Sequence, residues 1–337
     1  MNNMVKKIKR WINQYRSSAV ILLYHRVASL EHDPQLLSVT PQNFADHLEV
    51  LRQQYYPIQL EEVGVRTSTI ISKARYVVVT FDDGYVDNLY EAFPLLQAKN
   101  VPATIFVTAG QIGQKKEFWW DELERILLHS RDLPQNLEIT VKSQKYHWSF
   151  DQQNIDASSH WNIISSEQPT ARQTAYLELN HLLKGLDEST QQNILRQLQM
   201  WANVKYERRS SYSVLDEKEL VQLASNEIIE IGAHTITHPT LSAQPPAQQK
   251  NEIEHSKEIL ESILGRQIKT FSYPFGKRKD YTSITTELVK DAGYDYACAN
   301  YPGKVYSRTD PYQLPRFVVR DIDGDKFAKQ LRNWFDN

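Results

Sequence analysis

Apolar residues along this chain form short runs that alternate with segments of helical periodicity. The strongest run is 77–81, where three successive valines are typical of a strand buried in a parallel sheet. Because strands and helices alternate at the spacing of strand–helix–strand units, the pattern predicts an α/β fold with parallel strands. Further strands are expected at 19–24, 103–108, 228–233, 270–273, 294–299 and 317–319.

Helices are predicted between these strands from apolar spacing and from residues that begin or end helices. Residues 41–54 follow Thr40, a good N-cap, and Pro41 suits the first helical position. Asp216 is a second expected N-cap, and Gly265 is an expected helix end. The other helices are expected over 85–97, 172–200, 216–225, 246–264 and 282–292.

The pattern changes between residues 113 and 213, where Gln, Ser and Asn become frequent. Residues 137–141 and 146–150 are consistent with a hairpin that precedes the helical stretch over 172–200. The segment is too long for a plain loop, so we interpret it as an insertion packed on the main domain. The predicted division is a helix at 1–18, a barrel from 19–112 and 214–337, and an insertion at 113–213.

Residues 4–17 place apolar side chains at helical spacing with Lys and Arg between them. This helix would either close one end of the barrel or lie as a basic amphipathic helix on an anionic membrane surface. The apolar run at 19–24 is too short for the core of a signal peptide. We therefore expect a cytoplasmic protein, with peripheral contact at the inner face of the membrane as the alternative.

Composition narrows the class of protein further. The 337 residues are 41% hydrophobic and 24% charged, as in ordinary globular proteins, and the net charge of −2 gives no reason to expect nucleic acid as a partner. No apolar run approaches the roughly 20 residues of a membrane span. Cys298 is the single cysteine, which excludes an internal disulfide, and its apolar neighbours predict a small core residue. The oligomeric state stays open.

Two carboxylates follow the strongest strand. Asp82 and Asp83 come after the run at 77–81, at the sheet edge where α/β proteins bind ligands. One of them could hold a metal ion while its neighbour faces a water molecule on that ion. Gly84 permits the tight turn that such an approach requires. The alternative is that the pair is only a turn or a helix cap.

Two histidines follow a second strand. His234 and His238 lie just beyond the run at 228–233. Together with one carboxylate they would give three protein ligands and leave one coordination position open. A histidine pair alone is often a surface or core feature. Because two strand ends here carry complementary ligands, we favour a metal site.

These motifs, in this order, resemble the polysaccharide deacetylases of the NodB type, carbohydrate esterase family 4. Residues 80–84 match the family's T-F-D-D-G motif, and residues 234–238 match H-[ST]-x-x-H. Residues 21–27 and 271–276 extend the resemblance, and the former are typical of a branch with an N-terminal Tyr-His-x-Val motif. The resemblance implies a distorted (β/α)₇ barrel.

The resemblance also implies a metal-dependent reaction. Asp83, His234 and His238 would hold a divalent ion, and this ligand set suits Zn²⁺, although Co²⁺, Ni²⁺ or Fe²⁺ could bind there. The ion would polarise an acetyl carbonyl and acidify a water molecule. Asp82 would be the general base, and His25 would protonate the leaving amine, since imidazole titrates near neutral pH.

Residues 273–276 read Tyr-Pro-Phe-Gly, and the resemblance implies that they lie on the substrate side of the site. We expect Tyr273, Pro274 and Phe275 to contact substrate, with the backbone N–H of Phe275 facing the developing oxyanion.

One position departs from many members of the family. Ser272 stands where they carry the arginine that pairs with the base. Arg316, near the end of a late strand, is the candidate to replace it near Asp82 and substrate. The alternative is that Arg316 forms a surface or structural ion pair.

Two adjacent tryptophans open the predicted insertion. Trp119 and Trp120 would be either core anchors or platforms that stack on a sugar ring.

The expected function is removal of the N-acetyl group from an amino sugar of a glycan, with release of acetate, during the synthesis of cell-surface glycans. One alternative keeps the metal site and changes the bond, as in an O-deacetylase or a hydrolase of non-sugar amides. A non-enzymatic glycan-binding protein on an inactive barrel is a third interpretation, but the intact Asp-Asp and His-His pairs argue against it.

Overall fold

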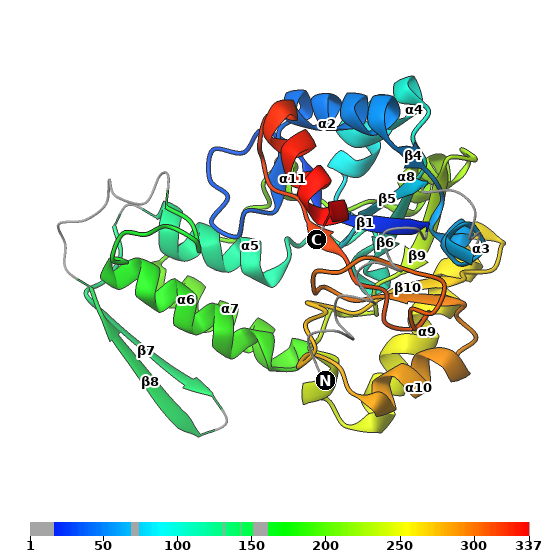
Figure 1. The fold of residues 1–337 in the computed structure, drawn as a ribbon. Coiled ribbons are helices and arrows are strands. Elements are labelled where there is room, and N and C mark those ends of the chain that lie inside the picture. The colour runs from blue at the N-terminus through cyan, green and yellow to red at the C-terminus, as the bar shows by residue number, and fades with distance from the viewer. Residues whose placement is uncertain (1–16, 69–73, 131, 142, 151–160, 337) are drawn as a thin grey trace, which may run out of the picture.

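A curled sheet of parallel strands forms the centre of the molecule (Figure 1). The computed structural model describes residues 17–68, 74–130, 132–141, 143–150 and 161–336. Within this part of the chain the sheet has eight strands, ordered β11-β10-β9-β6-β5-β1-β12, with β4 paired to β5. Their bounds are β1 (Ser18–Tyr24), β4 (Tyr56–Pro57), β5 (Arg75–Phe81), β6 (Ala103–Val107), β9 (Ile229–Ala233), β10 (Thr270–Ser272), β11 (Tyr296–Cys298) and β12 (Phe317–Val318).

The sheet curls far enough for its two ends to meet. At the end of β11, Cys298 forms an isolated parallel bridge with Leu314, and the chain that follows Leu314 enters β12 beside β1. The predicted strands are therefore all present, each within about two residues of its expected bounds. This arrangement is the distorted barrel that the sequence resemblance implied.

Helices surround the sheet (Figure 1). The expected caps are present: Thr40 accepts a hydrogen bond from the backbone of Asn43, Asp216 accepts one from Glu219, and Gly265 ends its helix in a left-handed conformation. The helices of the barrel are α2 (Pro41–Gln54), α3 (Val63–Ser68), α4 (Phe93–Lys99), α8 (Glu217–Ala224), α9 (Pro246–Leu264), α10 (Ser283–Asp291) and α11 (Gly324–Asp336).

Several helical features differ from the sequence prediction, among them the short α3, which was not predicted. The helix expected over 85–97 begins as a π-helix, η2 (Asn88–Ala92), before α4. The terminal helix α11 was not predicted, although Phe327, Leu331 and Phe335 repeat at four-residue spacing and are buried. The helix expected over 4–17 lies almost wholly outside the described residues. No helix of the described chain is long and apolar enough to cross a membrane.

The region expected to be an insertion forms a lobe beside the barrel (Figure 1). It has its own hydrophobic cluster, which includes Trp119, Trp120 and Tyr176 and also receives Tyr85 from the turn after β5. Its elements are α5 (Trp119–Glu124), η4 (Arg125–His129), the antiparallel pair β7 (Asn136–Val141) and β8 (Gln144–Ser149), α6 (Ala171–Lys184) and α7 (Glu188–Ala202). The lobe and the barrel therefore share a continuous apolar boundary.

Candidate active site

The turn after β5 places two carboxylates at the carboxyl edge of the sheet. The backbone N–H of Asp82 donates to the carbonyl of Tyr24, 3.0 Å away, which fixes the turn against β1. Asp83 has a φ of 78° and Gly84 a φ of 84°. A Cβ on Gly84 would lie 3.1 Å from a methyl group of Val107, so both the conformation and the space favour glycine. Asp82 faces Arg316, whereas Oδ1 of Asp83 faces His234 and His238.

The loop after β9 supplies the two histidines. The Nδ1–H of His234 donates to the carbonyl of Ser272, 2.7 Å away, which leaves Nε2 as the nitrogen with a free lone pair. Thr235 and His238 have φ values of 63° and 60°. The hydroxyl of Thr235 accepts a hydrogen bond from the backbone of His238, 3.1 Å away. The loop is therefore wound tightly enough to bring both rings to one point.

Glu252 on α9 holds this loop in place. One of its oxygens accepts the backbone N–H groups of Ile236 and Thr237, at 2.8 and 2.9 Å, and the other accepts the hydroxyl of Thr237 at 2.7 Å. Sequence reasoning missed this residue. The sequence shows only a glutamate within a predicted helix. Before the fold is known, such a residue cannot be distinguished from a surface glutamate.

Asp83, His234 and His238 converge as a buried cluster whose possible ligand atoms all lie within 4.8 Å of one another. Oδ1 of Asp83 is 3.6 Å from Nε2 of His234 and 3.4 Å from Nε2 of His238. Burial lowers the pKa of both imidazoles, and burial together with Asp82 raises the pKa of Asp83. Neutral imidazoles around a carboxylate that lacks a counter-charge are the donor set of a divalent cation, so these residues fit a metal ion.

Asp82 is held by a charge of its own. Nη1 and Nη2 of Arg316 donate to its two oxygens, each at 2.7 Å, and the hydroxyl of Ser272 donates to Oδ2 at 3.2 Å. Burial would raise the pKa of Asp82, but the Arg316 guanidinium and His234 together hold that pKa below its ordinary value. Asp82 is therefore an ionised carboxylate that can accept a proton.

His25 follows β1 and faces the same cavity. Its carbonyl accepts a hydrogen bond from the side-chain amide of Asn88, 3.0 Å away. Burial lowers the pKa of its imidazole to about 4, so the ring is neutral at neutral pH. The sequence argument supposed an imidazole that titrates near neutrality, and burial in the folded chain changes that expectation.

A buried ion pair fixes the chain next to His25. The guanidinium of Arg26 donates to Oδ2 of Asp87 at 2.9 and 2.8 Å, and Oδ1 of Asp87 accepts the backbone N–H of Val27 at 3.1 Å. The Arg26 guanidinium also lies between the rings of Tyr85 and Tyr212, 4.3 and 4.7 Å from their centroids. Sequence reasoning missed this pair because its members are far apart in the chain.

These groups open into a cavity of about 600 Å³ between the barrel and the lobe. Trp119 and Trp120 line it and are also almost fully buried, so they anchor the core and form a wall of the cavity. The Trp120 ring lies 4.8 Å from the His238 ring, and its N–H donates to the hydroxyl of Tyr85 at 2.9 Å.

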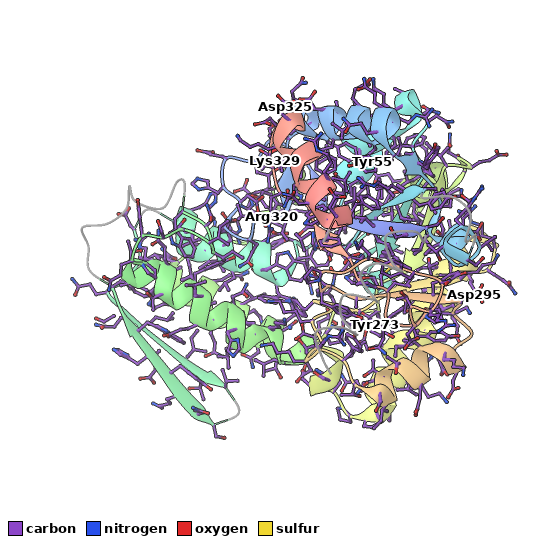
Figure 2. All side chains as sticks on the ribbon, viewed as in Figure 1. Tyr55, Tyr273, Asp295, Arg320, Asp325 and Lys329 are labelled. Carbon is purple, nitrogen blue, oxygen red and sulfur yellow. The ribbon has the colours of Figure 1, made fainter. Side chains whose placement is uncertain are left out.

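Of Tyr273, Pro274 and Phe275, which were expected to contact substrate, the structure places only Phe275 at the cavity. Phe275 lines the cavity, and its ring is 4.8 Å from that of His238. Tyr273 and Pro274 are buried and do not line the cavity, because the Tyr273 ring turns inward onto Tyr281. Figure 2 shows Tyr273 within the barrel half of the molecule. Arg316 is fully buried behind Asp82, so it orients the carboxylate and does not touch the cavity.

Fold and site together define an α/β-barrel with a His₂Asp cluster and an ion-paired carboxylate at the carboxyl ends of its strands. A sequence profile described as "Polysaccharide deacetylase" matches residues 70–156 and 189–297. These ranges cover more than half of the chain. The chain therefore belongs to the polysaccharide deacetylase family.

Individual relatives are distant. The chain is 20% identical over 327 residues to the "Putative polysaccharide deacetylase YxkH" of Bacillus subtilis (strain 168), covering 96% of this chain and 80% of that protein. The structure is similar to the deacetylase PplD of Streptococcus pyogenes, with a TM-score of 0.57, 16% identity, and coverage of 94% and 99% of the two chains. IcaB of Ammonifex degensii gives a TM-score of 0.56 at 17% identity, with coverage of 95% and 98%. These solved structures support the barrel fold.

Proposed function

We propose that the protein is a metal-dependent hydrolase that removes the N-acetyl group from an amino sugar of a glycan. The observation that carries this proposal is the convergence of Asp83, His234 and His238 next to the ion-paired Asp82. Family membership supports a hydrolase or esterase activity, and the choice of bond and the need for a metal are our inference. A place in the synthesis of cell-surface glycans, on the cytoplasmic side, belongs to the same proposal.

The metal would be held by Oδ1 of Asp83 and by the Nε2 atoms of His234 and His238. Zn²⁺ suits one carboxylate and two imidazoles, and Co²⁺, Ni²⁺ and Fe²⁺ accept the same donors. When bound, such an ion polarises a carbonyl and acidifies water. The hydrogen bond from His234 to Ser272 keeps the ring in the tautomer and orientation that coordination requires.

The remaining residues move protons and hold charge. Asp82 takes the proton of the attacking water, since Arg316 keeps it ionised while fixing both of its oxygens. The backbone N–H of Phe275 faces the oxyanion. His25 gives a proton to the departing nitrogen. Because burial keeps its imidazole neutral in the free site, we expect it to take up a proton from solvent when negative charge develops beside it, and to pass that proton to the nitrogen.

An acid that faces the cavity favours an amide as the substrate. An amine leaves readily only after its nitrogen is protonated, whereas an acetyl ester places a weaker demand on an acid. An O-deacetylase would use every other residue of the site in the same role. His25 is therefore the residue whose replacement separates the two reactions.

The test is acetate release by protein reconstituted with Zn²⁺, Co²⁺ or Ni²⁺. Chitooligosaccharides, acetylated xylan and a simple aryl acetamide represent N-acetyl sugars, O-acetyl sugars and non-sugar amides. We expect acetate from the chitooligosaccharides, and a loss of at least about 100-fold in kcat in His25→Ala. Faster acetate release from acetylated xylan than from chitooligosaccharides would instead establish an O-deacetylase. No acetate release from any substrate would refute the proposed enzymatic activity.

Metal content is measured on the same preparations. We expect about one transition-metal ion per chain in the wild type and almost none in Asp83→Asn. The matched control is Glu230→Gln, because Glu230 is a half-buried carboxyl away from the cavity. Its two oxygens accept the hydroxyls of Thr104 and Thr270, and a glutamine there can accept one hydroxyl with its carbonyl and donate to the other with its NH₂ group. Equal metal content in Asp83→Asn and in the wild type would contradict the proposed ligand set.

A further inference from the structure

On one wall of the cavity, positively charged side chains outnumber the negatively charged ones beside them. Lys184, at the end of α6 in the lobe, lines the cavity together with Lys277 and Lys279 of the loop after β10. Apart from Asp82 and Asp83, Asp280 is the one carboxylate among the described residues that line the cavity. Three ammonium groups thus face a single carboxylate on this side.

Lys184 is placed close to the metal cluster. Its Nζ lies 3.3 Å from Oδ2 of Asp280 and 3.9 Å from the centroid of the Phe275 ring. The Phe275 ring also lies against the His238 ring, at a centroid distance of 4.8 Å. A single aromatic ring therefore separates the Lys184 ammonium from a proposed metal ligand. A sugar unit whose acetyl group lies at the metal would bring its neighbouring substituents to this ammonium.

Asp280 leaves most of that positive charge uncompensated. It is almost fully buried, and Oδ2 also accepts the backbone N–H of Lys277 at 3.1 Å. Burial lowers the pKa of Lys184, Asp280 raises it, and the nearby Lys277 and Lys279 lower it again. Two exposed lysines thus crowd an ammonium that is already partly desolvated, and an anion bound between them would relieve the repulsion.

Arg320 is another cation that lines the cavity, and its guanidinium is already hydrogen-bonded within the protein. Figure 2 shows Arg320 on the face of the barrel that looks toward the lobe. Its guanidinium donates to the carbonyls of Leu36 and, at 3.3 Å, Gln35, and it interacts with the charge of Asp33. The uncompensated charge is therefore confined to the wall of Lys184, Lys277 and Lys279, which we name the lysine wall.

We propose that the lysine wall binds an anionic group, a phosphate or a carboxylate, carried by the glycan next to the acetylated sugar. This inference rests on the proposed function and names its substrate class. Lysine suits this role because an ammonium is a compact point charge that pairs with phosphate or carboxylate oxygens without a fixed planar geometry. The lobe would then select the substrate, while the barrel carries the reaction.

Binding tests this inference separately from turnover. Calorimetry on the Zn²⁺-reconstituted protein compares three probes: N,N′-diacetylchitobiose, its 1-phosphate, and the disaccharide of N-acetylglucosamine and N-acetylmuramic acid. We expect a charged probe to bind about tenfold more tightly than the neutral one at low salt, and this ratio to fall as salt rises. Preference for the phosphate alone assigns a phosphate, and preference for the muramic acid probe assigns a carboxylate.

Substitutions of the lysines test whether the lysine wall causes the preference for a charged probe. Lys277→Gln with Lys279→Gln changes two exposed side chains and leaves the fold intact, and Lys184→Gln changes the half-buried one. The matched control is Lys257→Gln, whose Nζ lies 4.9 Å from the Tyr294 ring centroid and donates to backbone carbonyls outside the cavity. We expect both lysine-wall variants to lose the preference for charge, with neutral binding unchanged, and the control to keep it.

The outcomes separate this inference from the proposed function. Equal binding of neutral and charged probes by the wild type, or a preference that survives in both lysine-wall variants, would overturn it. Acetate release without any charge preference refutes only the lysine wall. A charge preference without acetate release from any probe supports the wall as an anion site and refutes the proposed reaction.

Discussion

Four residues of the site adopt a left-handed backbone conformation that non-glycine residues rarely take. Asp83, Thr235, His238 and Phe275 have φ values between 60° and 78°. Such residues cost of order 1–3 kcal/mol each and persist only where the surroundings fix them. The hydrogen bonds of Glu252 supply that support for the histidine loop. Strain is therefore concentrated where side chains must converge.

Arg316 is the residue whose replacement should report most directly on Asp82. Arg316→Met removes the largest of the charges that oppose the effect of burial on Asp82, so the pKa of Asp82 rises and the acid limb of the kcat/KM profile moves to higher pH. In Arg316→Lys the charge remains, but a point charge cannot hold both oxygens, and we expect a smaller shift with a lower kcat. The measurement is kcat/KM against pH for all three proteins.

The same pair contributes to stability with a defined sign. Because the folded pKa of Asp82 is depressed, its contribution is present above the unfolded value of 3.8 and is lost as pH falls through the folded value. At neutral pH we expect Arg316→Met to lower the free energy of unfolding by about 3–5 kcal/mol, since a buried carboxylate loses its partner. Arg75→Met, which breaks an exposed pair with Asp336, should cost at most about 1 kcal/mol. Equal losses in urea unfolding would contradict the buried pair.

At the scale of elements, the barrel depends on its terminal helix. Helix α11 packs on α2 and β1, and the buried His47 of α2 bonds to the carbonyl of Ile322 just before α11, at 2.7 Å. The Phe327 ring stacks on His47 with a centroid distance of 4.0 Å. This helix therefore covers the strand that leads to His25.

Two substitutions on α11 test this contribution. Leu331 is fully buried, so Leu331→Ala should lower the free energy of unfolding by about 2–5 kcal/mol. Lys329, two residues earlier, is exposed on the outer surface (Figure 2), and Lys329→Ala should change it by less than about 0.5 kcal/mol. Urea unfolding of both variants gives the comparison. Similar small effects would mean that α11 is peripheral to the barrel.

At the scale of the whole molecule, barrel and lobe share buried contacts. Arg26 of the barrel pairs with Asp87 and lies against Tyr212, near the end of the segment that forms the lobe. The hydroxyl of Tyr85 donates to Asp121 of α5 at 2.6 Å. Separating the two parts would expose charged groups and the wall of the cavity together.

We therefore expect barrel and lobe to unfold in one cooperative transition. Five of the seven tryptophans lie between residues 113 and 213, so tryptophan fluorescence reports mainly on the lobe, whereas far-UV circular dichroism reports on the whole chain. The two signals should give coincident urea transitions, and in Arg26→Met both should shift together to lower urea. Separate midpoints in the wild type would show that the lobe is an independent unit.

The sequence by itself determined the features that depend on local patterns. Apolar runs predicted the barrel strands other than the short β4, and capping residues such as Thr40 and Asp216 predicted where helices begin, because both act through neighbours in the chain. The positions of Asp83, His234 and His238 at strand ends also followed, since parallel strands share one carboxyl edge.

Only the tertiary structure decided which distant groups meet. It placed Arg316 on Asp82 across 234 residues of sequence and turned Tyr273 away from the cavity. It also lowered the pKa of His25 by burial and set Lys184 beside Phe275. These outcomes depend on burial and on long-range contacts, which the periodicity of the sequence does not encode.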